Sequence, residues 1–172
     1  MKYLKYSTIA SLLFLVLMAC EKRDYPKGLS EYDHHYYSVF VPNTNDTVNS
    51  KTRTDLIKLP VQFYSAFTRN YDAVTKYVVS NAAYNTTAYK PAVSGVDYNV
   101  VDKNGNVIPS SDTTYTIVFP QAIQAMDTIY IKLLGNTTPG LRRFEVQILD
   151  NITDQYEVDN FSSAYKKPVK IN

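Results

Sequence analysis

Apolar and polar residues alternate along three segments in the second half of the chain, residues 113–119, 127–134 and 141–149. Alternation with a period of two places every second side chain on the same face of an extended strand. Each segment therefore predicts a β-strand with one buried face. The residues that share these apolar faces are Tyr115, Ile117, Phe119, Ile129, Ile131, Leu133, Phe144, Val146 and Ile148.

Shorter strand patterns fill the rest of the chain. We predict further strands over residues 36–41, 56–64, 76–83, 95–101 and 164–171. Residues 43–55 and 85–94 are polar and predict loops, and Asn104-Gly105 is typical of a tight turn. Pro60 lacks an amide donor, which favours an edge strand or a bulge at its position. About seven to eight short strands without an amphipathic helix predict an all-β fold, a two-sheet antiparallel β-sandwich over residues 33–172.

The first 19 residues are typical of a signal peptide. Lys2 and Lys5 provide a positive start, and residues 9–18 form an apolar run that is short for a membrane span. The segment ends in Leu17-Met18-Ala19-Cys20, which fits a lipobox. We therefore predict that residues 1–19 are cleaved and that Cys20 is lipidated. An ordinary signal peptide or an uncleaved anchor with a coincidental cysteine remains the alternative.

Residues 20–32 are charged, contain Pro26 and Gly28, and carry few large apolar side chains. This composition is typical of a flexible tether between a lipid anchor and a folded domain. Cys20 is the only cysteine of the chain, so that an internal disulfide is excluded and lipidation explains the thiol better than redox chemistry.

The balance of charge argues against nucleic acid as a partner. The formal net charge is +2, but both lysines of the signal peptide leave with it, so that the mature chain carries 16 basic and 16 acidic residues. Tyrosine is frequent, with 16 residues against no tryptophan. Strand propensity and half-buried positions explain this excess, and an aromatic platform for a sugar or a protein is the functional alternative.

Residues 92–98 read Ala-Val-Ser-Gly-Val-Asp-Tyr and fit the pattern A-x-x-G-x-D-Y. Strand patterns follow that end at Phe119-Pro120 and then cover residues 128–133, 143–148 and 168–171. In this order the motifs resemble Calx-beta-type immunoglobulin-like domains, and the layout is similar to small, mostly uncharacterised lipoproteins of Bacteroidota. Many of those are encoded beside outer-membrane nutrient-uptake systems. The resemblance covers about residues 56–171 and implies an immunoglobulin-like β-sandwich.

The chain departs from the calcium-binding members of that family. Those carry clustered acidic residues in loops, whereas Asp150, Asp154 and Asp159 are spread along this sequence without a dense cluster. Calcium requires about six to eight converging oxygen ligands, so that we expect no calcium site. Asp97 is better explained as a turn or strand-end residue that binds local backbone amides.

No pattern of catalytic or metal-binding residues emerges. Neighbouring side chains on a strand point to opposite faces, so His34 and His35 do not suit one ion, and we expect both to be solvated at the end of the tether. Glu145 alternates with apolar residues and is expected to face solvent. The pairs Arg142-Arg143 and Lys166-Lys167 are expected at solvated strand ends. We therefore expect no enzyme, no metal and no cofactor.

Three Asp-Thr pairs, at Thr47, Thr113 and Thr128, fit the O-glycosylation sequon of Bacteroidota. Thr47 falls in a predicted loop, and Thr113 and Thr128 fall at predicted strand starts, where exposure is expected. The alternative is that Asp-Thr is simply a favourable junction between a turn and a strand.

The pattern as a whole predicts a non-catalytic binding or accessory lipoprotein of the cell envelope, associated with a nutrient-uptake or surface complex at the outer membrane. One rival is a carbohydrate-binding module that uses Tyr84 and Tyr89 as a platform for glycan. Another is an adhesin or pilus-like subunit, in which residues 43–55 or the C-terminal strand exchange between molecules.

Overall fold

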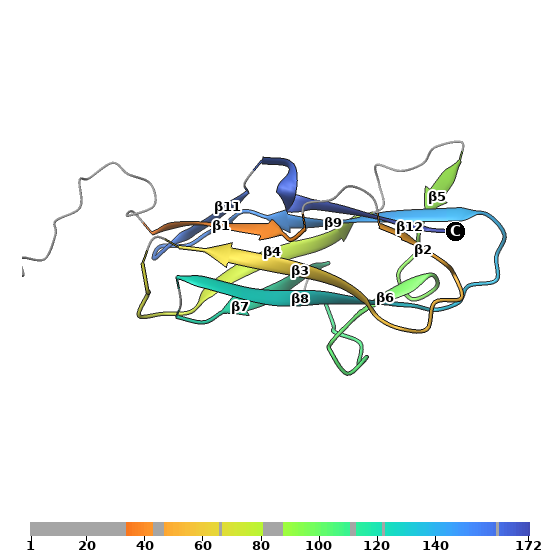
Figure 1. Cartoon of the computed structure of the whole chain (residues 1–172), viewed down its shortest axis with the longest axis horizontal. Helices are drawn as coiled ribbons and strands as arrows, with labels where there is room; N and C mark the ends of the chain where they lie inside the picture. The colour runs from red at the N-terminus through yellow and green to blue at the C-terminus, as the bar shows by residue number, and fades with distance from the viewer. Residues whose placement is uncertain are drawn as a thin grey trace, which may run out of the picture.

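The structure is a computed structural model, which describes residues 34–42, 47–65, 67–80, 88–110, 113–121, 123–160 and 162–172. The described residues form two packed β-sheets whose strands run along the long axis of the molecule (Figure 1). Sheet A has the order β10-β11-β1-β3-β8-β6. The bounds of these strands are Asn151–Ile152, Glu157–Asn160, His35–Phe40, Ile57–Tyr64, Gln124–Leu133 and Tyr98–Val101.

Sheet B has the order β2-β12-β9-β4-β7, and the short strand β5 pairs with β9 beside this path. These strands span Thr47–Asn49, Lys166–Ile171, Leu141–Leu149, Ala73–Ser80, Thr114–Phe119 and, for β5, Tyr89–Pro91. A 3-10 turn, η2, at Ser162–Tyr165 precedes β12. The all-β sandwich that the alternating pattern predicted is confirmed.

The core lies between the two sheets and is built by the alternation seen in the sequence. Ile117, Ile131 and Phe144 belong to three different strands, and each is at most 6% exposed. Phe144 stacks on Tyr98 of the opposite sheet, with ring centroids 4.2 Å apart. Burying such side chains supplies about 1.5–3 kcal/mol each and drives the two sheets together.

Short strands that the sequence pattern missed complete the sheets. The loop expected at residues 43–55 contributes β2, and the connection expected at residues 85–94 contributes β5. The strands β10 and β11 follow β9, and three pairs, β1 with β11, β2 with β12 and β5 with β9, are parallel. A strand of two to four residues is too short to show a period of two in its sequence. Its partners in the sheet hold it extended, and the local pattern does not reveal them.

Pro60 does not lie at an edge or in a bulge, in contrast to the prediction. It belongs to β3, between β1 and β8, in a register without an extra residue. The Pro60 carbonyl accepts a hydrogen bond from the Val41 amide at 3.0 Å, so the carbonyl and the ring nitrogen, which carries no hydrogen, face the β1 side. The chain leaves β1 after Phe40. The missing donor is tolerated because β1 ends there.

Asp97 binds local backbone as expected and fixes the start of β6. Its carboxylate accepts hydrogen bonds from the Val93 amide and from the Asn136 side chain, both at 2.7 Å, and Arg142 Nε lies 3.8 Å away. The intervening Gly95 has φ +79°, a backbone conformation that glycine adopts readily. The Asp-Tyr motif therefore closes a turn and sends Tyr98 into the core.

The C-terminal strand β12 lies inside sheet B, paired with β9 on one side and β2 on the other. The predicted signal peptide over residues 1–19, Cys20 and the predicted tether up to residue 32 lie outside the described residues. Across the residues that the structure describes, no helix is long and apolar enough to cross a membrane.

Candidate functional site

One lateral side of the sandwich is open, between β7 of sheet B and β8 of sheet A. In the described ranges, β7 pairs only with β4, and β6 pairs with β8 only over Tyr130 to Leu133. The first part of β8 therefore faces β7 across a groove of about 320 Å³, which we call the open-side groove. It is lined by Tyr77, Val101, Asp102, Lys103, Asn104, Ile108, Thr116, Ile117, Asp127, Thr128, Ile129 and Tyr130.

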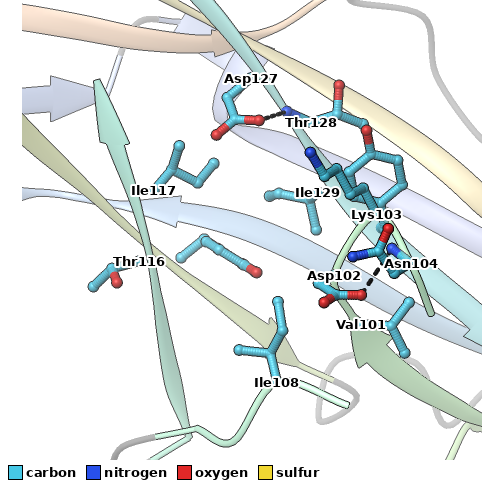
Figure 2. Close-up of a pocket in the computed structure, with 12 residues that line it drawn as sticks. Val101, Asp102, Lys103, Asn104, Ile108, Thr116, Ile117, Asp127, Thr128 and Ile129 are labelled. Carbon is cyan, nitrogen blue, oxygen red and sulfur yellow. Dashed lines mark hydrogen bonds between the residues drawn. The ribbon is translucent and has the colours of Figure 1, made fainter. Parts of the chain in front are cut away.

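The two sheets meet at the floor of the groove. Figure 2 shows Ile117 of β7 and Ile129 of β8 directed toward each other across it. Asp127 lies at one end, and Ile108 and Asp102 lie toward the other. The floor is apolar because Ile117 and Ile129 are inward-facing residues of β7 and β8, and no strand lies between these two.

Tyr77 adds a polar group to this apolar floor. Its side chain is 3% exposed and stacks on Tyr115, with ring centroids 5.2 Å apart. Burial raises the pKa of Tyr77 well above its ordinary value, and Tyr115 and Asp127 add to the effect, so that the hydroxyl stays protonated. No group in the described part of the chain forms a hydrogen bond with this hydroxyl. A ligand in the groove would provide that partner.

The rim of the groove is polar and held by local hydrogen bonds. Asp102 accepts hydrogen bonds from the amides of Asn104 and Asn106 and from the Asn106 side chain, which hold the pKa of Asp102 below its usual range. This carboxylate shapes the turn next to the groove. The Thr128 amide donates to Asp127 at 2.7 Å.

The edges of the two sheets differ in length and protection. The outer strands β10 and β2 have two and three residues, and β6 has four residues and is partly covered by the segment that carries Ile108, whose amide donates to Val100. In contrast, β7 has six residues, Thr-Tyr-Thr-Ile-Val-Phe, without a charge or a proline. Soluble proteins usually shorten, charge or cover such edges. The edge of β7 shows none of these protections in the described chain.

A cluster of ligand-type side chains lies on the outer face of sheet A, at its other edge. His35, Glu157 and Asp159 place their ligand atoms within 4.8 Å of one another, and His35 Nε2 lies 3.1 Å from Asp159 Oδ2. Burial raises the pKa of Asp150, and a hydrogen bond with Asp159 raises it further. Burial also acts to raise the pKa of Asp159, but the Asn160 amide and His35 outweigh it and lower this pKa. The His35 ring stacks on Tyr37.

This geometry corrects two expectations. His35 is half-buried and paired with Asp159, rather than solvated, because β1 pairs with β11. Of the acidic residues that are spread along the sequence, Asp150 and Asp159 come together. The set of one imidazole and two carboxylates is of the type that holds a divalent transition metal. The sequence did not reveal this set, because more than a hundred residues separate His35 from Glu157 and Asp159.

His34 is also not solvated. Its Nδ1 lies 2.6 Å from the Tyr71 hydroxyl and 3.0 Å from the Tyr36 hydroxyl, and its ring packs edge-on against Phe67. Arg69, 3% exposed, lies over the Phe63 ring and donates to the Pro120 carbonyl. This aromatic cluster closes one end of the core.

Two further residues are buried where we expected solvent. Glu145 is 4% exposed and accepts a hydrogen bond from the Gln147 side chain. Lys167 is 6% exposed, and its Nζ donates to the Pro42 carbonyl at 3.0 Å. Desolvation lowers the pKa of Lys167. Residue alternation places Glu145 on the outer face of sheet B, but it does not show which outer positions other segments cover. Lys167 lies instead on the same face as Val169 and Ile171, opposite the buried Val146, and not at a solvated strand end.

The predicted modification and platform residues do not meet in one site. Thr47 begins β2 rather than lying in a loop, Thr113 is exposed with φ +66° just before β7, and Thr128 lies within β8, which starts at Gln124. Tyr89 is half-buried in β5 and donates its hydroxyl to Asn172. Its predicted platform partner, Tyr84, lies outside the described residues.

The open-side groove was not foreseen from the sequence. The uncharged run from Thr114 to Phe119 was visible as a strand. An edge position follows only from the order of strands in the sheet. The orphan hydroxyl of Tyr77 likewise depends on what lies next to it in space.

The fold and site define a β-sandwich with one open lateral side. No protein-family model matches the chain, and no curated protein matches it. Among solved structures it is similar to the calcium binding domain CBD12 of CALX1.1, at 12% identity over 78% of this chain and 44% of that chain, with a TM-score of 0.47. It is also similar to a candidate carbohydrate binding protein from Bacteroides ovatus, at 13% identity over 79% of this chain and 36% of that one, with a TM-score of 0.45.

This chain spans less than half of the length of each of these two chains. At such TM-scores and identities the likenesses carry no argument about function. The assignment of an all-β sandwich therefore rests on the strands and their pairing.

Proposed function

We propose that the protein is a non-catalytic accessory lipoprotein of the bacterial cell envelope that binds a protein partner in the open-side groove. The lipobox that ends at Cys20 and the tether up to residue 32 support a domain held near a membrane. The similarity of the motif order to Bacteroidota lipoproteins supports an outer-membrane location and an association with a nutrient-uptake or surface complex.

The observation that carries the binding role is the Tyr77 hydroxyl on an apolar groove floor. This hydroxyl is not among the buried polar atoms that lack a partner, so it reaches the water of the groove, and a ligand that replaces this water can form a hydrogen bond with it. The floor, formed by Ile117 and Ile129, offers apolar contact, and the Asp127 carboxylate offers a polar contact at the rim. This combination of an apolar floor and few directed polar groups is typical of binding sites.

A protein partner fits better than the glycan platform considered from the sequence. Tyr89 uses its hydroxyl for Asn172, and Lys170 lies 5.5 Å from the centre of its ring, so that this ring is engaged within the fold. The open-side groove in turn lies between two strand edges, whose backbone groups recognise polypeptide.

Site-directed photocrosslinking tests the binding role. A photoreactive amino acid replaces Thr116 in β7, and the control carries it at Val48 in β2, an exposed position on another edge. We expect a discrete protein adduct in native membranes from position 116 alone. Equal adducts from both positions, or none from position 116, would contradict the proposal.

A second experiment tests the anchor separately. Replacement of Cys20→Ala removes the acceptor of the lipid, so the protein should lack the mass of the lipid and keep the mass of its unprocessed form. An unchanged mature size and membrane fraction would contradict lipid anchoring at Cys20 and would leave the proposed binding in the open-side groove unaffected.

A further inference from the structure

We propose that the partner binds by adding an extended, uncharged segment as a new strand along β7, in the open-side groove. This inference rests on the proposed function and specifies the binding mode and the chemistry of the partner.

The edge of β7 is the first argument. Its six residues are β-branched, aromatic or apolar, and Val118 is 56% exposed. An uncharged run of high β-propensity on a free edge is the type of segment that recruits another strand. Since the outer strands β10 and β2 have only two and three residues, β7 offers the longest free ladder in the described chain.

The place beside β7 is the second argument. The first part of β8, Gln124 to Ile129, has no neighbour on its outer side in the part of the chain that the structure describes. Strands in a sheet lie about 4.8 Å apart, so that a segment placed next to β7 enters the groove between β7 and β8. The added strand would close the open side without moving either sheet.

The floor of the groove defines the side chains of the segment. Alternate residues of an added strand point inward, over Ile117 and Ile129, where apolar side chains fit. A residue near Tyr77 must offer a hydrogen-bond partner to its hydroxyl, which a serine, a threonine or a backbone carbonyl supplies. The intervening residues point outward beside Thr116 and Val118, both exposed. The segment is therefore an alternating, β-branched stretch without proline and without charge at its inward positions.

A peptide display experiment tests this mode. The purified full-length protein selects peptides from a random dodecapeptide library, and the best binder is synthesised with and without N-methyl groups on alternate amides. We expect an alternating apolar pattern in the selected peptides. N-methylation on the β7-facing amides should weaken binding at least about tenfold, because it removes ladder donors.

Two matched variants locate the binding edge. Val118→Lys places a charge on β7, and Val48→Lys places one on β2, at nearly equal exposures of 56% and 57%. We expect Val118→Lys alone to weaken the peptide about tenfold or more. Both side chains are exposed, so that both variants should keep the wild-type melting temperature. The N-methylated peptide tests the same point without altering the protein.

The outcomes separate this inference from the proposed function. If the adduct at position 116 forms but N-methylation and Val118→Lys leave peptide binding unchanged, the groove binds a partner and strand addition is wrong. Strand addition is also wrong if Val118→Lys weakens none of the selected peptides. Self-association in sedimentation that Val118→Lys abolishes would make a second copy the occupant and overturn the partner segment proposed here.

Discussion

The two lateral sides of the sandwich end in opposite ways. On one side, sheet A finishes with the two-residue β10 and a group of carboxylates around Asp159. On the other, sheet B finishes with β7, six uncharged residues beside a groove. The first edge is too short and too charged to pair with another chain, whereas the second is long and free. Protein contacts are therefore expected on the β7 side.

Substitutions of core residues should show the largest difference in stability loss between the packed centre and the open side. Phe144 is fully buried against Tyr98, so Phe144→Ala leaves a cavity and should lower the free energy of unfolding by about 3–5 kcal/mol. Ile117 borders the groove, where part of its surface lacks a neighbour, and Ile117→Ala should cost about 2 kcal/mol. Denaturant unfolding measures both. Equal losses would mean that the open side is packed as tightly as the centre.

A pair of tyrosines sharpens the comparison at an intermediate scale. Tyr36 and Tyr77 are both at most 3% exposed, but the Tyr36 hydroxyl lies 2.6 Å from the Tyr71 hydroxyl. Tyr36→Phe should therefore lose about 1–2 kcal/mol of stability, whereas Tyr77→Phe removes an unpartnered hydroxyl and should leave stability unchanged or slightly higher. Thermal unfolding of the two variants provides the measurement. A clear loss for Tyr77→Phe would show that its hydroxyl has a partner.

The charged edge provides the smallest expected effect. The pKa of Asp150 is raised by burial and by Asp159, so its contribution to stability is present below the ordinary aspartate pKa and is lost as the pH rises through the raised value. Asp150→Asn does not titrate and should be more stable than the wild type at neutral pH. The gain is only about 0.5 kcal/mol, because the carboxylate is partly desolvated but still largely screened by water.

Melting curves from acidic to neutral pH test this effect. The difference in melting temperature between Asp150→Asn and the wild type should increase as the pH rises through the acid range. Asp159 has a lowered pKa, so its stabilising effect is lost in both proteins as the pH falls. An advantage that is constant across the range would show that repulsion between the two carboxylates is not its cause.

Several features followed from local pattern alone. The pattern predicts the inward faces of β7, β8 and β9, since Ile129 and Val146 lie between polar neighbours and Ile117 shares its face with Phe119. The role of Asp97 also followed, because its amide partner is only four residues away. Such features depend on neighbours in the chain, which the sequence contains.

The errors arose where distant segments meet. Glu145 is covered on what alternation assigns as an outer face, and the Lys167 ammonium group meets the Pro42 carbonyl from a distant segment. His35 meets Glu157 through a parallel pairing. Pro60 is tolerated in an interior strand. The reason is that β1 ends before the position where a backbone amide at residue 60 would donate to it. Alternation distinguishes the two faces of a strand, but it does not identify the strand's neighbours.

By itself, the sequence determined the all-β class, the buried face of each long strand and the lipobox that predicts an anchor at Cys20. The tertiary structure decided that β7 is an edge, that β6 leaves part of β8 unpaired, and that the Tyr77 hydroxyl lies between them without a partner. The physical reason is that periodicity reports the burial of side chains, whereas the pairing of backbone groups depends on the order of strands in space.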